Sequence, residues 1–225
     1  MEKFPFEFAC LYDQKHDFTF YAVPAVRSEN GLPEKIRNMF IARMERFGYV
    51  GFSYEIDNEF HYRSTYVLVG DADGNIVMTS RVTLRPEGTM VPFEYGLRTN
   101  GESYKLEAGT QIVDINTYAY SKGHYETAMP LLTAGLGLHV KAKGARGAFC
   151  LYDQRNQAIR DSYSSVGFVH SKRFPEPIYF PTFCYRRRPN RDIEQVFWRI
   201  MEWDEATIDA HAVRALKDYQ HTEGR

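Results

Sequence analysis

The stretch NQAIRDSYSSVGF (residues 156–168) decides the fold of this 225-residue chain. It follows a strand-like run, RGAFCLYDQ (146–154), and predicts a short helix. Four of its residues form a spaced motif, N-x6-Y-x3-G-F, in which they are Asn156, Tyr163, Gly167 and Phe168. A strand followed by a helix with Tyr, Gly and Phe also occurs in other folds. The order of the elements around the motif is therefore needed to identify the fold.

The pentapeptide CLYDQ occurs twice, at residues 10–14 and 150–154. The first copy continues as KHDFTFYAVPAV, which predicts a strand, and the second continues into the helix at 156–168. Because the similarity ends with the pentapeptide, we expect no internal repeat. Two strand-like segments then share five residues by coincidence, and whether they pair side by side stays open.

Composition indicates a folded protein. Hydrophobic residues make up 44% and aromatic residues 15% of the chain, and its formal net charge is −1, which does not favour a nucleic-acid-coating protein. The three cysteines lack C-x-x-C spacing, which is typical of reduced thiols. We expect no signal peptide, no membrane span and no nucleic-acid partner, and a cytoplasmic location.

The remaining elements follow from periodicity and turn residues. A helix begins near Pro33 and ends near Gly48, and Asp73-Gly74-Asn75 joins two strands of a hairpin. Further expected elements are strands at 20–26, 110–120 and 178–186, a long helix at 124–144, and one or two helices within 192–221. Gly135 and Gly137 inside the long helix indicate close packing against a sheet.

This order predicts a mixed α/β (α+β) fold: a mostly antiparallel twisted sheet with helices on both faces. The basic run Arg186, Arg187, Arg188 and Arg191 marks a boundary. We therefore predict one domain at 1–185 and a C-terminal helical extension at 186–225.

The motif at 156–168, with this element order, resembles the GNAT acyltransferase superfamily over roughly residues 20–185. The resemblance implies transfer of an acyl group from a thioester to an amine, with Tyr163 protonating the departing thiolate. Members that use coenzyme A usually carry a glycine-rich turn, Q/R-x-x-G-x-G/A, for the pyrophosphate. Here that turn is SKGHYETAMPLL (121–132), with Glu126 and Ala128 at the places of two glycines, which weighs against CoA binding of the usual kind.

One branch of the superfamily has a degenerate turn: the acyl-homoserine-lactone synthases and N-acyl amino acid synthases, which commonly take long acyl chains from acyl carrier protein. The front half of this chain is similar to that branch. By position, the branch's acidic residue, strand Arg, Met and Phe correspond to Asp57, Arg81, Met90 and Phe93. Asp114 matches a further acidic residue, but Thr117 stands where the branch has Arg, which favours an amine acceptor other than the homoserine-lactone precursor.

Aminolysis of a thioester needs a deprotonated amine and a protonated leaving thiol. We expect Asp114 to be the base, directly or through water, and Tyr163 the acid, with Arg81 holding an acceptor carboxylate. Glu94 and Glu107 are alternative bases, and Arg81 is alternatively a structural partner of Glu94 or Asp57. A packing role for Tyr163 and a turn-bonding role for Asp114 are equally open.

The expected substrate-binding residues are Arg81, Phe93, Glu94, Asn116 and Tyr118, with Asp114, Asn116 and Tyr118 on one strand face. The expected thioester-binding residues are Tyr120, Lys122, Gly123, His124 and Asn156. Phe93, Tyr95, Tyr118 and Tyr120 would line an acyl tunnel or belong to the core. We expect no metal site, because no histidine has metal-ligand spacing, and no tightly bound cofactor; acyl-phosphopantetheine, on acyl carrier protein or CoA, would be the co-substrate.

A basic face suited to an acidic carrier protein is predicted from Lys141, Lys143, Arg146, Lys172, Arg173 and the 186–191 arginines, although a solvated surface explains them too. The sequence thus favours an N-acyltransferase that moves a fatty acyl group from acyl carrier protein to an amino acid or similar small amine. A CoA-dependent acetyltransferase, or a non-catalytic binding module that dimerises through residues 192–220, are the alternatives.

Overall fold

The computed structural model describes residues 10–25, 31–121, 123–182, 184–190 and 192–222. The strands of its large sheet are β1 (Cys10–Asp13), β2 (Phe18–Pro24), β4 (Ser64–Gly70), β5 (Ile76–Leu84), β6 (Val113–Tyr120), β7 (Ala148–Asp153), β8 (Val169–His170), β11 (Trp198–Trp203) and β12 (Gln220–Thr222). A small sheet has β3 (Tyr49–Val50), β9 (Tyr185–Arg187) and β10 (Ile193–Gln195). The helices are α1 (Leu32–Arg46), α2 (Tyr54–His61), α3 (Tyr125–Ala142), α4 (Gln157–Ser165) and α5 (Glu205–Asp218).

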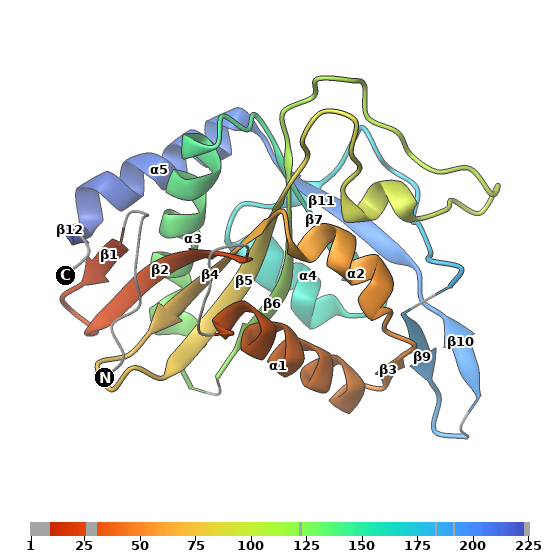
Figure 1. The fold of residues 1–225 in the computed structure, drawn as a ribbon, viewed down its shortest axis with the longest axis horizontal. Coiled ribbons are helices and arrows are strands. Elements are labelled where there is room, and N and C mark those ends of the chain that lie inside the picture. Colours follow the sequence, from red (N-terminus) through yellow and green to blue (C-terminus); the bar gives the residue numbers. More distant parts are fainter. Residues whose placement is uncertain (1–9, 26–30, 122, 183, 191, 223–225) are drawn as a thin grey trace.

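The large sheet has the order β12-β1-β2-β4-β5-β6-β7-β11-β8 (Figure 1). Its neighbours pair antiparallel except β6 and β7, which are parallel. Helices α3 and α5 cover one face, and α1 and α2 lie on the other (Figure 1). The fold is therefore the expected mixed, mostly antiparallel sheet between helices.

The apolar cores follow these layers. The largest core lies between the sheet and α3, and a second, smaller core joins α1 to β4 through Ile36 and Tyr66. A Cβ on Gly135 would lie 2.5 Å from the ring of Phe20 on β2, so this glycine lets α3 approach the sheet, as expected. A Cβ on Gly137 would lie 2.3 Å from His211, so this second glycine serves packing against α5 rather than against the sheet.

Two predictions for the C-terminal quarter were wrong. The described residues of 178–186 form no continuous strand: Ile178 and Tyr179 each make one isolated bridge, and β9 begins only at Tyr185, after Cys184 at a φ of +64°. The segment 192–221, expected to form one or two helices, begins with β10 and β11, and within described residues 192–222 only α5 is a helix. Strand β11 was hard to recognise because both its faces are buried, Ile200 in one core and Trp203 in another, so polar alternation is missing.

The last segment is joined to the rest of the chain through the sheet. Strand β11 lies between β7 and β8, and β12 pairs with β1. The predicted boundary after residue 185 therefore falls within a sheet that the two segments share.

The two CLYDQ copies belong to different parts of this sheet. The first ends β1, which pairs with β12 and β2, and the second ends β7, which pairs with β6 and β11, so they are not side by side. Both end in the same local turn. The Asp13 carboxylate accepts from the Lys15 amide at 3.0 Å, and the Asp153 carboxylate accepts from the Arg155 amide at 3.0 Å. The two pentapeptides therefore end their strands with the same hydrogen bond from a backbone amide to the Asp side chain.

Candidate active site

Parallel strands β6 and β7 separate soon after they pair. Only two residue pairs join them, Val113 with Ala148 and Asp114 with Phe149, while β6 continues alongside β5 as far as Tyr120. The two strands therefore diverge toward their carboxyl ends, and we call this splayed part of the sheet the cleft. In open α/β sheets, ligands bind outside the carboxyl ends of neighbouring strands, so this cleft is the first place to look for a site.

A β-bulge at Thr117 changes which side chains face the cleft. Thr117 has a φ of +52°, and the pairing of β5 with β6 shifts there, so that Thr117 and Tyr118 lie opposite the single residue Ser80. The extra residue inverts the alternation of side chains. Asn116 therefore bonds to Arg81 on the α2 side, whereas the Tyr118 hydroxyl contacts Met129 of α3. The expectation that Asp114, Asn116 and Tyr118 share one face was wrong, because a bulge cannot be recognised from period-two spacing.

Asp114 is a buried carboxylate, with 1% of its surface exposed. Its Oδ1 accepts from Asn116 Nδ2 at 2.5 Å, and its buried Oδ2 has no hydrogen-bond partner within the described ranges. Burial raises the pKa of Asp114 to about 6, against the opposing effects of Asn116, Arg81 and Arg63. A carboxylate with this pKa, and with one oxygen available, is suited to accept a proton near neutral pH.

Arg81 reaches Asp114 through Asn116. Its Nη1 lies 2.7 Å from Asp57 Oδ1 and its Nε donates to Asn116 Oδ1 at 2.7 Å, while Arg37 Nε lies 2.6 Å from the second oxygen of Asp57. Arg81 is 4% exposed. Both ends of its guanidinium are thus bonded within the protein, which matches the structural alternative, pairing with Asp57. In this conformation Arg81 orients Asn116, and through it Asp114, rather than presenting a fork to a substrate.

Tyr163 lies on α4, on the α3 side of the sheet. Its ring is 6.1 Å from that of Tyr118 and 5.6 Å from that of Phe168, so two residues of the N-x6-Y-x3-G-F motif contact each other. Burial raises the pKa of the Tyr163 phenol well above 10, and Cys150, Tyr118 and Asp114 raise it further. The phenol is therefore protonated at neutral pH, as a general acid must be.

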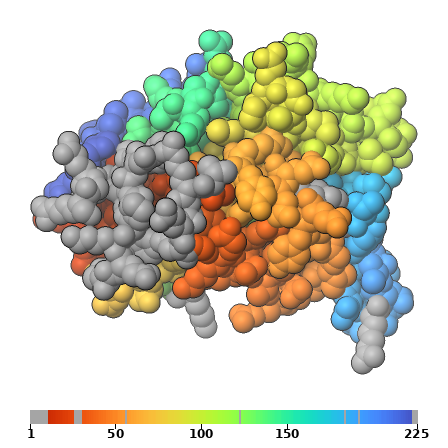
Figure 2. Space-filling view, viewed as in Figure 1, coloured from red at the N-terminus to blue at the C-terminus, as the bar shows by residue number. Residues whose placement is uncertain are grey.

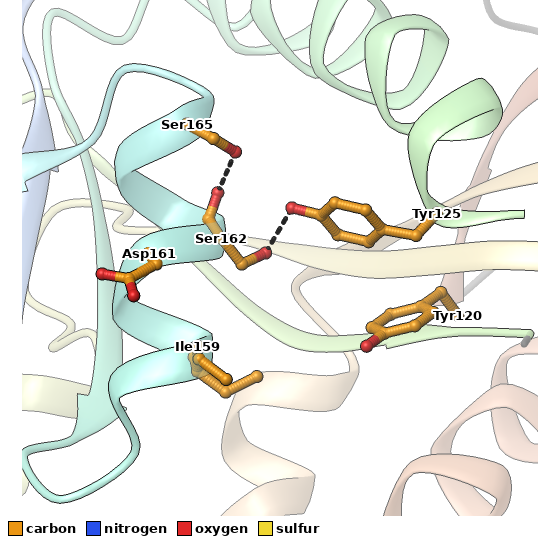
Figure 3. A pocket seen from close by; sticks show the side chains of 7 residues that line it. Tyr120, Tyr125, Ile159, Asp161, Ser162 and Ser165 are labelled. Carbon is orange, nitrogen blue, oxygen red and sulfur yellow. Dashed lines mark hydrogen bonds between the residues drawn. The ribbon is translucent and has the colours of Figure 1, made fainter. Parts of the chain in front are cut away.

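A pocket of about 340 Å³ lies beside the cleft, between the end of β6, the start of α3 and one side of α4 (Figure 3). The side chains that line it are Tyr120, Tyr125, Ala158, Ile159, Asp161, Ser162 and Ser165. The Tyr125 hydroxyl and Ser162 Oγ are 2.7 Å apart and join α3 to α4 (Figure 3). Arg43 of α1 donates to the Tyr120 carbonyl at 2.7 Å, which fixes the end of β6. We call this space the cleft pocket.

The other expected thioester residues lie around this pocket without lining it. Gly123 is exposed with a φ of +90°, and the His124 ring contacts that of Phe18 at 5.9 Å. Asn156 caps α4, its Oδ1 accepting from the Ile159 amide at 3.2 Å. Lys122 lies outside the described residues.

The structure also resolves how the unusual turn before α3 is built. Glu126 is exposed in the first turn of α3, so its carboxylate meets solvent at the end of the helix that would otherwise attract phosphate. Ala128 is fully buried, and its methyl group packs in the main core.

Phe93, Glu94 and Tyr95 lie apart from the cleft pocket. Phe93 is fully buried in a separate aromatic core, 5.2 Å from Phe149. Glu94 accepts from Arg85 and from two backbone amides, and so holds its own loop together. The Tyr95 hydroxyl donates to Glu59 at 2.6 Å. The four aromatics expected along one tunnel are therefore divided between two regions, and Glu107, an alternative base, is exposed on a turn.

The residues expected to form one basic face lie at opposite ends of β7. Arg186 contacts Asp153 at the carboxyl end, 3.4 Å away, whereas Arg146 precedes the strand and Arg173 lies beside Gly147. A six-residue strand spans about 17 Å. The two groups of arginines therefore lie about one strand length apart, and Arg191 lies outside the described residues.

Several residues of the site were not anticipated: Arg37, Arg43, Tyr125 and Ser162. Arg37 pairs with α2, a helix the sequence analysis did not predict, because its acidic and aromatic residues resemble a strand or loop. Tyr125 and Ser162 meet only through the tertiary packing of α3 on α4. Residues 54–61, spaced as a helix before the hairpin, held the one local signal that was available.

No protein-family profile and no curated protein matches this chain. Solved structures do match. BjaI, a CoA-dependent acyl-homoserine lactone synthase, aligns over 92% of this chain and 90% of its own, at 13% identity and a TM-score of 0.52. FeeM, an N-acyl amino acid synthase from uncultured soil microbes, aligns over 88% and 98%, at 9% identity and a TM-score of 0.51. A spermidine N-acetyltransferase from Vibrio cholerae aligns over 85% and 98%, at 12% identity and a TM-score of 0.51.

These structures share the GNAT acyltransferase fold, and at such identities their likeness concerns the fold. The chain has that fold, which confirms the resemblance predicted from residues 156–168. Two further observations concern membrane spans and metal sites. No helix in the described parts of the chain is long and apolar enough to cross a membrane. The described residues also contain no group of three or more His, Cys, Asp or Glu side chains placed to hold a metal ion.

Proposed function

We propose that this protein is an N-acyltransferase that moves an acyl group, of the fatty class, from an acyl-phosphopantetheine thioester to the amine of an amino acid or similar small molecule. The single observation that carries the proposal is Asp114, a buried carboxylate with a pKa of about 6 and an unpartnered oxygen, on the strand that borders the cleft. Perturbed carboxylates of this kind are concentrated at functional sites.

In the proposed reaction the amine nitrogen attacks the thioester carbonyl carbon, the C–N bond forms and the C–S bond breaks. Asp114 accepts the proton of the substrate ammonium; since Asp114 is 1% exposed, this proton passes through a water molecule in the cleft. Tyr163 donates its phenolic proton to the departing thiolate, and the resulting phenolate takes up, through water, the second proton that the nitrogen loses as the amide forms. Asn116 and Arg81 are positioning residues, because they act through the orientation of Asp114.

We propose acyl carrier protein as the donor. The exposed carboxylate of Glu126 lies in the first turn of α3, where a pyrophosphate would otherwise bind, and it disfavours a ligand with the charge of CoA. A carrier-bound arm has a single phosphodiester and suffers less repulsion. The acceptor would enter from the α2 side, where Asp114 and Asn116 lie.

The test supplies acyl-carrier protein and acyl-CoA in parallel, each with acetyl and long-chain groups, together with a mixture of amino acids and polyamines. Mass spectrometry then identifies any amide product. We expect a long-chain acyl amide that forms faster from the carrier. Product from acetyl-CoA alone would replace the proposal with CoA-dependent acetylation, and a folded protein that forms no amide from any donor would contradict acyl transfer altogether.

A further inference from the structure

A second pocket, of about 520 Å³, lies where α1 ends and where β9, β10 and the start of α4 meet. Figure 1 shows α1, β3, β9 and β10 gathered at this corner, and Figure 2 shows their surfaces adjoining there. Five arginines and one carboxylate supply its charges: Arg46, Arg155, Arg186, Arg187, Arg188 and Glu194. We call it the arginine pocket. All five cations are arginine, the side chain whose planar fork fits phosphate and carboxylate oxygens.

A carboxylate of the chain itself, that of Glu194, already pairs with two of these arginines. Glu194 Oε1 lies 2.8 Å from Arg155 Nη2, and Oε2 lies 2.5 Å from Arg188 Nη2. These bonds lower the pKa of Glu194. Two guanidinium groups from different elements thus converge on a single oxyanion, and Glu194 holds them at the edge of the pocket.

Of the other three arginines of the pocket, Arg186 is paired, and Arg46 and Arg187 remain available. Arg186 lies 3.4 Å from the Asp153 carboxylate, which also accepts from the Tyr49 hydroxyl and from the backbone amide of Arg155. Arg46 and Arg187 are exposed, and within the described ranges neither side chain has an ion pair or hydrogen bond. Five arginines against the two carboxylates of Glu194 and Asp153 leave a net charge of three positive, in a chain whose net charge is −1. Such a concave concentration of one sign attracts small anions.

Two elements, α1 and the start of α4, lead from the arginine pocket toward the cleft pocket. Arg155 directly precedes Asn156, the cap of α4, and Ile159 in the first turn of α4 lines the cleft pocket. On α1, Arg43 bonds to the Tyr120 carbonyl beside the cleft pocket, and Arg46 lies one turn further on. The cleft pocket itself has Asp161 as its charged lining residue, so a phosphate is better stabilised in the arginine pocket.

We propose that the arginine pocket is a phosphate-binding site that receives the phosphate of the thioester donor at the mouth of the cleft. This site is separate from the turn before α3, where Glu126 is exposed. The assignment to the donor rests on the proposed function, whereas the affinity for phosphate does not. The shared chemistry is a phosphate ester, and it comes from carrier-bound phosphopantetheine, from free phosphopantetheine or from CoA.

The first measurement is independent of activity. Inorganic phosphate is titrated into the wild-type protein, into the double variant Arg46→Gln/Arg187→Gln, and into a charge-matched control, Arg214→Gln/Lys217→Gln, which alters exposed residues of α5. Calorimetry should show saturable binding that weakens at least tenfold in the pocket variant and less than twofold in the control. Equal weakening in both variants would show that the ion responds only to overall charge, and no weakening in either would show that it binds elsewhere. Either result would overturn the site.

The second measurement assigns the site to the donor. Acyl-pantetheine has no phosphate, and acyl-phosphopantetheine differs from it by that group alone. We expect wild-type protein and control to have a KM for acyl-phosphopantetheine at least tenfold below that for acyl-pantetheine, and the pocket variant to bring this ratio near one. A preserved ratio, or an effect on the KM of the amine instead, would refute the assignment. If no donor is turned over but phosphate binding depends on the pocket, the site stands and the proposed function fails.

Discussion

Replacing Asp114 with Asn tests whether this carboxylate is held in a costly ionised state. Its pKa rises from an ordinary 3.8 to about 6 because the group is buried. Each pKa unit corresponds to ~1.4 kcal/mol, so ionised Asp114 lowers the free energy of unfolding by ~3 kcal/mol near neutral pH. The folded protein binds the proton more tightly than the unfolded chain, and stability therefore falls as pH rises from 3.8 through 6.

Asn keeps the acceptor that Asn116 needs but does not titrate. Its amide adds an unpaired donor, which costs ~1–3 kcal/mol at every pH. The informative quantity is therefore the stability difference between Asp114→Asn and the wild type, measured by urea unfolding at pH 4 and pH 7.5. We expect this difference to move in favour of the variant by ~2–3 kcal/mol between the two pH values.

The control is Asp153→Asn, at the end of the neighbouring strand. Asp153 is equally buried, but it accepts from Tyr49 and lies against Arg186, so its substitution should destabilise the protein at pH 7.5. A stability difference for Asp114→Asn that is the same at both pH values would refute the reasoning, because the carboxylate would then carry no penalty for ionisation.

Three more changes test other parts of the account. Tyr163→Phe should lower kcat at least ~tenfold, because the phenolic proton is lost while the ring contact with Phe168 remains; an unchanged rate would remove Tyr163 from the mechanism. Asp57→Asn leaves Arg37 and Arg81 buried without their carboxylate and should lower the free energy of unfolding by ~3–5 kcal/mol, measured with urea. The control Asp209→Asn, in an exposed ion pair, should lower it by less than ~1 kcal/mol. Similar small losses in both variants would contradict a buried charge network. A chain ending at residue 185 should not fold, because β11 and β12 complete the sheet beside β7 and β1; a cooperative thermal transition of that fragment would support the boundary predicted from sequence instead.

Local pattern was sufficient for most of the fold. The hairpin at Asp73-Gly74-Asn75, the long glycine-containing helix α3 and the helix at 156–168 each had a signal within a few residues, and the structure contains all three. Strand β11 was missed because a strand buried on both faces has no alternation. Helix α2 was missed because its helical spacing extends over only eight residues, which are rich in acidic and aromatic side chains.

The site was harder to predict than the fold, for two physical reasons. The bulge at Thr117 moves Tyr118 to the α3 side, and a positive φ at a β-branched residue leaves no trace in the sequence pattern. Arg81 was expected at a substrate, but a buried guanidinium needs a permanent partner, and Asp57 on the unrecognised helix α2 provides it. Spacing can indicate which residues share an element, but it cannot determine which side chains from different elements meet.

The pH dependence of amide formation by the wild type and by Asp114→Asn tests the central claim most directly. With saturating donor, log kcat/KM for the amine should rise with unit slope below about pH 6 in the wild type and then level off, since Asp114 must be ionised to accept the proton. In the variant this ionisation should be absent, and the rate should be lower throughout. A wild-type profile without an ionisation near 6, or the same profile in the variant at an undiminished rate, would show that Asp114 is not the base.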